Sequence, residues 1–65
     1  MDGWRVEVTN EDGRTARERY FDSARAARSH AAGASRDGLP RSVIGPDGRE
    51  DSRWRGGHLE EGGAA

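Results

Sequence analysis

The chain of 65 residues has no cysteine and no lysine, and it has few large apolar side chains. The absence of cysteine excludes disulfide bonds and thiolate metal sites, which stabilise many very small domains. No apolar run approaches the roughly 20 residues of a membrane-spanning helix. The N-terminal residues lack the basic and apolar regions of a signal peptide. The sequence therefore predicts a chain without a membrane segment, and the expected compartment is the cytoplasm.

The scarcity of large apolar residues limits the core. About 31% of the chain is hydrophobic, and nine of those residues are alanine. At roughly 1.5–3 kcal/mol for each large side chain buried, the other eleven contribute on the order of 15–30 kcal/mol. Ordering the chain costs roughly 1.5 kcal/mol per residue. We therefore expect a single small domain that needs tight packing or a partner surface.

The charge is balanced overall but uneven along the chain. Eleven arginines oppose twelve acidic residues, for a net charge of −1, which argues against a non-specific polyanion binder. Residues 14–36 nevertheless hold six arginines against Glu18 and Asp22, which weakly indicates an anionic partner. The exclusive use of arginine fits either a GC-rich coding bias or selection for bidentate recognition of phosphate or carboxylate.

The first third of the chain predicts a β-hairpin. Residues 4–9 alternate apolar and polar side chains, which is typical of a half-buried strand. A three-residue loop at 11–13 would return the chain as a second strand over 14–20. The register that follows places Glu18 on the core face against Val6, so a slip of register stays open. The favourable pairs in this register are Trp4 with Tyr20, Glu7 with Arg17, and Val8 with Ala16.

An alanine-rich helix is predicted over 23–32. Asp22 can cap its first turn, with Phe21 packing against Ala26, and Gly33 provides a stop. Small apolar residues recur at helical spacing and form one smooth stripe, which lets a helix lie close to a sheet. The stripe consists of Ala24, Ala27, Ala31 and Ala34.

The second half of the chain predicts a third strand at 41–44 and a turn at Pro46-Asp47-Gly48. Residues 49–54 form either a short edge strand or merely extended chain. The glycine-rich, acidic residues 56–65 are expected to be a disordered tail. The prediction is one α+β domain over residues 1–55, with the order β-β-α-β, a sheet of three or four strands and one helix on one face.

Two family resemblances fit this order. Phe21-Asp22-Ser23 before the alanine-rich helix, the run 43–49, Ser52 and Trp54 resemble short bacterial β-β-α-β domains of unknown function. Residues 4–27 also resemble, more weakly, the arm-type, AP2-like DNA-binding domain of phage integrases. The matching residues are Trp4-Arg5-Val6, Gly13-Arg14, Phe21-Asp22-Ser23 and Ala26-Ala27. The second resemblance implies a sheet that reads the DNA major groove while a helix packs behind it.

The sequence offers no catalytic or metal-binding pattern. No serine lies in a nucleophile elbow, and His30 and His58 lack the spacing of a metal-ligand pair. The turn at 45–48 lacks the features of a phosphate loop. We expect no enzyme activity, no cofactor and no metal.

The arginines are the main candidates for function. Arg5, Arg17 and Arg19 are expected on the sheet face opposite Trp4, either neutralised by neighbouring acids or open to a phosphate, a base edge or an acidic protein patch. The candidate nucleic-acid-binding set is Arg5, Arg14, Arg17, Arg19, Arg25 and Arg28.

Trp54 is the second candidate. Flanked by Arg53 and Arg55, it either covers the sheet edge or is an exposed anchor for a partner. Two functional hypotheses follow. The first is a small non-catalytic protein-interaction module that binds another protein or associates with itself, for example as a homodimer. The alternative is a DNA-binding accessory protein that uses the arginine-bearing hairpin.

Overall fold

The computed structural model describes residues 3–62 and contains one α-helix and five strands. The predicted α+β class with one helix is confirmed, whereas the predicted three or four strands are fewer than the five observed. In chain order the elements are β1 (Trp4–Thr9), β2 (Thr15–Phe21), α1 (Ala24–Ala34), the 3₁₀ turn η1 (Ser35–Asp37), β3 (Arg41–Ile44), β4 (Glu50–Arg55) and β5 (His58–Gly62).

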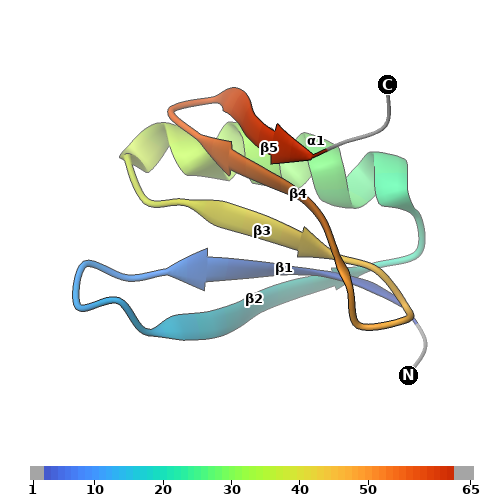
Figure 1. The fold of residues 1–65 in the computed structure, drawn as a ribbon. Coiled ribbons are helices and arrows are strands. Elements are labelled where there is room, and N and C mark those ends of the chain that lie inside the picture. The colour runs from blue at the N-terminus through green and yellow to red at the C-terminus, as the bar shows by residue number, and fades with distance from the viewer. Residues whose placement is uncertain (1–2, 63–65) are drawn as a thin grey trace.

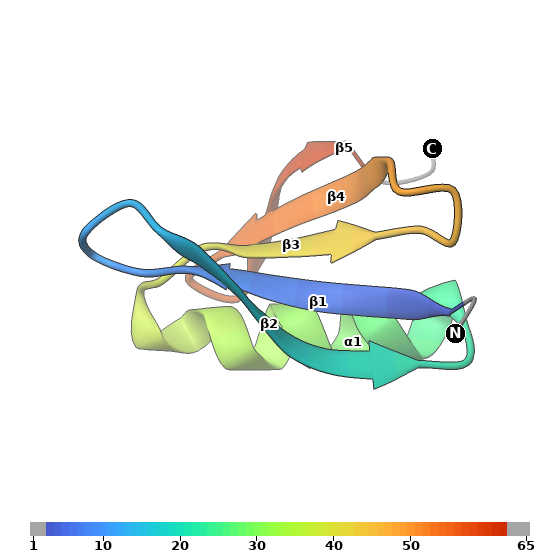
Figure 2. The same ribbon diagram turned by 90° about the horizontal axis from the view of Figure 1, so that it is seen from below.

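The five strands form one antiparallel sheet in the order β2-β1-β3-β4-β5, so β2 and β5 are its two edges (Figure 1). α1 covers one face of the sheet, and the opposite face is uncovered (Figure 2). We call these the helix face and the open face. Val6 and its partner Val43 are fully buried on the helix face, while Arg5 and Glu7 alternate with Val6 and point to the open face.

The predicted three-residue loop between the first two strands is confirmed. The Asn10 N–H donates to the Arg14 carbonyl at 2.8 Å, and the Gly13 N–H donates to the Asn10 carbonyl at 2.9 Å. The same two bonds, each 2.9 Å long, close the loop between β3 and β4 around residues 45–49. Both turn predictions therefore hold.

The register of the first hairpin is correct near the loop and wrong beyond it. Glu7 pairs with Arg17 as predicted, but Val6 pairs with Arg19, and Trp4 pairs with Phe21 rather than Tyr20. The difference is a β-bulge in which Glu18 is the extra residue. The bulge keeps Phe21 on the helix face and moves Tyr20 to the open face, where it is 44% exposed.

Two further bulges occur in the sheet, and each also has an acid as its extra residue. In β4 the extra residue is Asp51, because Val43 pairs with Ser52 and Ile44 with Glu50. In β5 the extra residue is Glu60, because Arg53 pairs with Glu61 and Trp54 with Leu59. A bulge re-aims the side chain of the extra residue, so these three acids have partners that strict alternation does not predict.

The helix begins and ends one or two residues later than predicted. Ser23, not Asp22, is the N-cap, and its Oγ accepts a hydrogen bond from the Ala26 N–H at 3.2 Å. α1 continues through Gly33 to Ala34, and the left-handed residue that ends the helical segment is Gly38, at φ 91°. The predicted alanine stripe is confirmed: its two central members, Ala27 and Ala31, are fully buried.

The core lies between this stripe and the helix face. Val6, Val43, Ala27 and Ala31 form its fully buried centre. Three aromatic residues pack around that centre: Trp4, Phe21 and Trp54. Tyr20, which the predicted register paired with Trp4, lies outside this core, and Trp54 packs against it.

Residues 56–62 form structure where the sequence predicted a disordered tail. Gly56 and Gly57 have φ values of 62° and 86°, the left-handed pair that a two-residue hairpin loop requires. This loop lets β5 return along β4, and the Gly56 N–H donates to the Ser35 carbonyl at 2.8 Å. The prediction for residues 63–65 lies outside the described residues.

Candidate functional site

The first three candidate arginines do not share one face. Arg5 and Arg17 lie on the open face, opposite Tyr20 and Glu7 respectively. Arg19 is the cross-strand partner of the buried Val6, and directly opposed residues point to the same face, so Arg19 belongs to the helix face. The expectation that all three lie opposite Trp4 is therefore wrong for Arg19, and the bulge is the reason.

Arg5 is neutralised within β1. Its Nε donates to Glu7 Oε2 at 2.8 Å, and the two side chains are 33% and 25% exposed. A partly buried, charge-assisted hydrogen bond of this length leaves little unbalanced charge for a phosphate. On the open face, Arg5 is therefore paired with Glu7 and is not a free cation.

Arg28 is also held within the fold. It extends from α1 to Asp51, the bulge residue of β4, with distances of 2.8 Å from Nε to Oδ2 and 2.6 Å from Nη2 to Oδ1. This two-pronged bond from Arg28 holds the pKa of Asp51 below its usual range and raises the pKa of Arg28. The pair joins the helix to the sheet.

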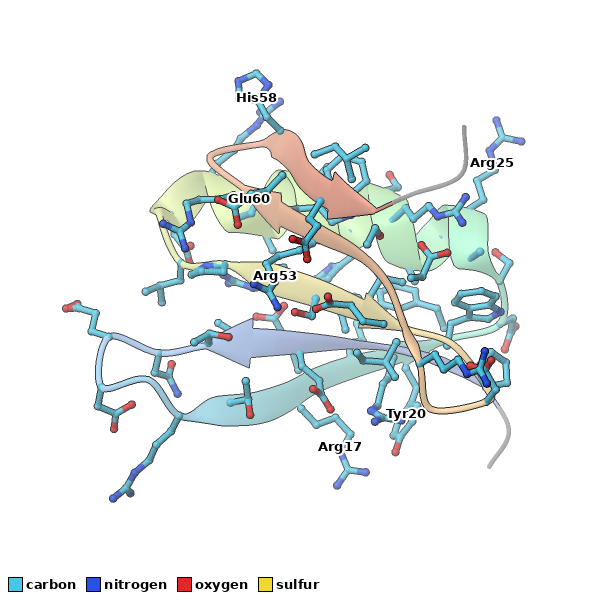
Figure 3. All side chains as sticks on the ribbon, in the orientation of Figure 1. Arg17, Tyr20, Arg25, Arg53, His58 and Glu60 are labelled. Atoms are coloured by element: carbon cyan, nitrogen blue, oxygen red, sulfur yellow. The ribbon has the colours of Figure 1, made fainter. Side chains whose placement is uncertain are left out.

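Arg14 and Arg25 lie away from the other candidates. Arg14, in the loop between β1 and β2, has a side chain that is 86% exposed and lies 3.7 Å from Asp12, a separation typical of a weak surface pair. Arg25 projects beyond the N-terminal end of α1, on the other side of the molecule from Arg17 (Figure 3). The six candidate arginines therefore do not form one continuous surface.

The second candidate set has a structural role. The indole nitrogen of Trp54 donates to Ser52 Oγ at 2.9 Å, and the ring packs against the core, so Trp54 is not an exposed anchor. Its neighbours Arg53 and Arg55 pair with Glu50 at 3.2 Å and with Glu60 at 3.3 Å. These contacts favour the alternative in which Trp54 covers the sheet.

Sequence reasoning missed a charged network between the helix face and α1. The guanidinium of Arg41, whose side chain is 6% exposed, donates to Glu18 Oε1 at 3.0 Å and to both carboxylate oxygens of Asp37 at 2.9–3.0 Å. Glu18 also bonds His30 Nε2 at 3.0 Å. The one available signal was the placement of Glu18 against Val6, since an acid on a core face needs a partner.

The ionisation of this network follows from its contacts. Partial burial alone would raise the pKa of Glu18, but hydrogen bonds from Arg41 and His30 outweigh that effect and lower it. The hydrogen bonds that Arg41 donates likewise lower the pKa of Asp37, and the same bonds raise the pKa of Arg41. The carboxylates are thus held in their charged form, which is the arrangement of a structural ion cluster.

Two arginines of β2 remain without an acidic partner and stack on aromatic rings instead. The Arg17 guanidinium carbon lies 5.3 Å from the centroid of the Tyr20 ring, and Arg17 Nη1 donates to the Tyr20 hydroxyl. Arg19 lies at the same distance from the Phe21 ring. Neither arginine forms an ion pair with a carboxylate of residues 3–62. We call Arg17, Arg19 and Tyr20 the β2 patch; Arg17 and Tyr20 lie side by side along β2 (Figure 3).

The part of the chain that the structure describes contains no group of three or more His, Asp or Glu side chains placed to hold a metal ion. His30 bonds Glu18, and its ring packs against Phe21 with centroids 5.2 Å apart, so its environment is accounted for. Between residues 3 and 62 no helix is long and apolar enough to cross a membrane.

Comparison with known proteins gives no assignment. No protein-family model matches the chain, and no curated protein or solved structure matches it at a significant level. The two resemblances drawn from short stretches of sequence therefore stay predictions.

Proposed function

We propose that this protein is a small, non-catalytic protein-interaction module that binds through the β2 edge of its sheet. One observation carries this proposal: β2, a strand with only one neighbour in the sheet, carries two arginines without an ion pair, Arg17 on the open face and Arg19 on the helix face, beside the half-exposed Tyr20. Tyrosine and arginine are among the residue types enriched at the energetic centres of protein interfaces.

The distribution of charge favours a protein partner over nucleic acid. Seven of the eleven arginines form ion pairs with carboxylates of residues 3–62. Binding to a nucleic-acid backbone requires several cations that are free to displace counterions. Two arginines without an ion pair on β2, in a chain whose net charge is −1, suit a limited acidic patch on a protein.

The test is affinity capture from nuclease-treated lysate with the purified protein as bait. The double variant Arg17→Ala/Arg19→Ala removes the free charges of the β2 patch, and Arg25→Ala is the matched control, because Arg25 is exposed and lies on the other side of the molecule from Arg17 (Figure 3). We expect a protein captured by the wild type and by the control, and lost with the double variant. Capture that is equal for all three proteins would overturn the role of β2.

The alternative function, DNA binding by the hairpin, is favoured by the same two free arginines. It predicts a retarded DNA complex whose affinity falls steeply as salt is raised. Fluorescence anisotropy with a labelled duplex and a labelled single strand at low salt tests it. Binding that Arg17→Ala/Arg19→Ala abolishes would establish this alternative, and the absence of binding at low salt would remove it.

A further inference from the structure

The two edges of the sheet carry opposite charges. The β2 edge has Arg17 and Arg19, which no carboxylate of residues 3–62 neutralises. The β5 edge has Glu60 and Glu61; Glu60 pairs with Arg55, whereas Glu61 forms no ion pair within the described residues. Glu61 lies opposite Arg53 in the ladder, but Arg53 pairs with Glu50 instead.

Each edge also presents one large apolar side chain to solvent. Tyr20 on β2 is 44% exposed, and Leu59 on β5 is 48% exposed. Among residues 3–62, Tyr20 and Leu59 are the exposed large hydrophobic residues. Tyr20 is paired with Arg5 and lies on the open face, whereas Leu59 is paired with Trp54 and lies on the helix face, so the two edges present apolar surface on different faces.

Backbone groups on both edges point outward without a partner strand. In an antiparallel ladder, hydrogen-bonded and non-hydrogen-bonded pairs alternate. Asn10 and Arg14 form a hydrogen-bonded pair, so the pairs Thr9–Thr15 and Glu7–Arg17 are non-hydrogen-bonded pairs. The backbone N–H and C=O groups of Thr15 and Arg17 therefore point away from β1. In the hairpin closed by Arg55 and His58, the same alternation directs the groups of Leu59 away from β4.

We propose that the protein associates head to tail, with the β5 edge of one copy against the β2 edge of a second copy and Glu61 facing Arg17. This inference rests on the proposed function and names its partner. Arg17 and Glu61 both lie on the open face, since each is paired with a residue of that face, Glu7 and Arg53 respectively. A sheet continued from one copy to the next would place them on the same side.

The alternative edge pairings bring like charges together. Two β2 edges related by a two-fold axis would oppose their free arginines, and two β5 edges would oppose their glutamates, which is destabilising. The head-to-tail contact is the edge pairing in which the charges attract. If both helices stay on one side of the sheet, β5 runs parallel to β2, because the strands alternate in direction across the order β2-β1-β3-β4-β5.

The expected contact is small and weak. The bulges at Glu18 and Glu60 shorten the stretch of each edge that can pair, and one strand pair buries less than the roughly 1,200 Å² of a stable interface. A head-to-tail contact has no two-fold axis, so association continues beyond the dimer into rings or short chains. An interface between two copies of the open face would instead stop at the dimer.

Sedimentation equilibrium between about 10 µM and 1 mM tests this proposal, since weak contacts become populated in this range. We expect the average mass of the wild type to rise continuously past that of a dimer, and to rise less when salt is raised. Arg17→Glu and Glu61→Arg should each weaken association at least about tenfold, because each makes the two edges alike in charge. A mixture of the two variants should regain it, because each edge then meets one of opposite charge.

Arg25→Glu is the matched control, with the same change of charge outside both edges, and it should associate as the wild type does. Arg17→Ala removes the charge without reversing it and should weaken association less than Arg17→Glu does. Thermal melts of every variant show whether a variant that no longer associates is still folded. Association that persists in both reversed variants, or that stops at the dimer, would overturn the head-to-tail contact. A wild type that stays monomeric at 1 mM would exclude a second copy as partner, whereas the proposed function fails only in the capture experiment.

Discussion

Ser35 is a fully buried polar residue that connects the end of α1 to the turn between β4 and β5. Its Oγ donates to the Ala32 carbonyl at 3.0 Å and accepts from the Gly57 N–H at 2.9 Å. Its own carbonyl accepts the Gly56 N–H at 2.8 Å. The hydroxyl and the carbonyl of Ser35 thus accept hydrogen bonds from both backbone N–H groups of the turn that precedes β5.

Removing this hydroxyl should be costly. Ser35→Ala leaves the Gly57 N–H without its acceptor in a partly buried site, and an unsatisfied donor of this kind costs about 1–3 kcal/mol. We expect a loss of free energy of unfolding in this range, measured by urea denaturation. Ser29→Ala, at an exposed position of the same helix, is the control and should change the free energy by less than about 0.5 kcal/mol.

At the scale of the element, α1 contains one glycine that no contact requires. A Cβ built on Gly33 has no other atom within 4 Å, and Gly33 is exposed. Gly38 has equally open surroundings but a φ of 91°, which side chains rarely adopt. Both positions therefore have room for a side chain, and they differ only in that the backbone of Gly38 is left-handed.

Alanine should have opposite effects at these two glycines. Gly33→Ala should stabilise the protein by about 0.5–1 kcal/mol, because glycine costs this much in a helix. Gly38→Ala should destabilise it by about 1 kcal/mol, because alanine is strained in the left-handed region. Thermal and urea unfolding of both variants measure the difference. A Gly33→Ala protein that is less stable than the wild type would contradict the account of α1.

The elements that short stretches of sequence specify were predictable, and those that depend on distant partners were not. The loop at 11–13, the turn at 46–48 and the alanine stripe depend on local patterns, and the structure has all three. The fifth strand was missed because its residues are polar and rich in glycine. Its turn depends on Ser35, which is distant in the sequence from Gly56.

The site was harder to predict than the fold because ion pairing is a three-dimensional property. Arg17 and Arg19 have no acidic partner among residues 3–62, and their role as binding residues stays a prediction, but the sequence placed them on one face. One bulge residue, Glu18, separates their faces and pairs with Arg41. The alternation of apolar and polar residues along the sequence predicts neither the bulge at Glu18 nor its ion pair with Arg41.

At the scale of the whole molecule, ion pairs join separate elements. Arg28 of α1 binds Asp51 of β4, and Arg41 of β3 binds Glu18 of β2 and Asp37 of η1. All three acids have a pKa lowered from ordinary values of 3.8 for Asp and 4.5 for Glu. A pKa that is lower in the folded state than in the unfolded chain stabilises the fold above the unfolded pKa.

Stability should therefore decrease on acidification. The contribution of these acids is complete above their unfolded pKa values and is lost as the pH falls through the lowered pKa values of the folded state. Asp51→Asn should reduce stability at pH 7 and make it less dependent on pH between about 5 and 3, because it removes one of the three groups. Asp22→Asn is the matched control at an exposed position outside these ion pairs, and it should keep the loss of stability on acidification. Urea midpoints measured across this range test both statements.

The size of the core sets how much change the whole molecule tolerates. A domain of 65 residues is expected to have a free energy of unfolding of about 3–10 kcal/mol. Val43 is fully buried at the centre of the core, and Val43→Ala removes two methyl groups and leaves a cavity, for a loss of about 2 kcal/mol. In a domain of this size such a loss lowers Tm by about 8–16 °C.

The control for this change is Leu59→Ala, which removes more apolar surface in total but at a residue that is 48% exposed. At low protein concentration it should lower Tm by less than half as much as Val43→Ala. Thermal melts followed by circular dichroism compare the two. If Leu59→Ala were the more damaging change, stability would depend on the β5 edge more than on the core. Because few apolar residues are buried, we expect the ion pairs between elements and the hydrogen bonds of Ser35 to supply the rest of the stability.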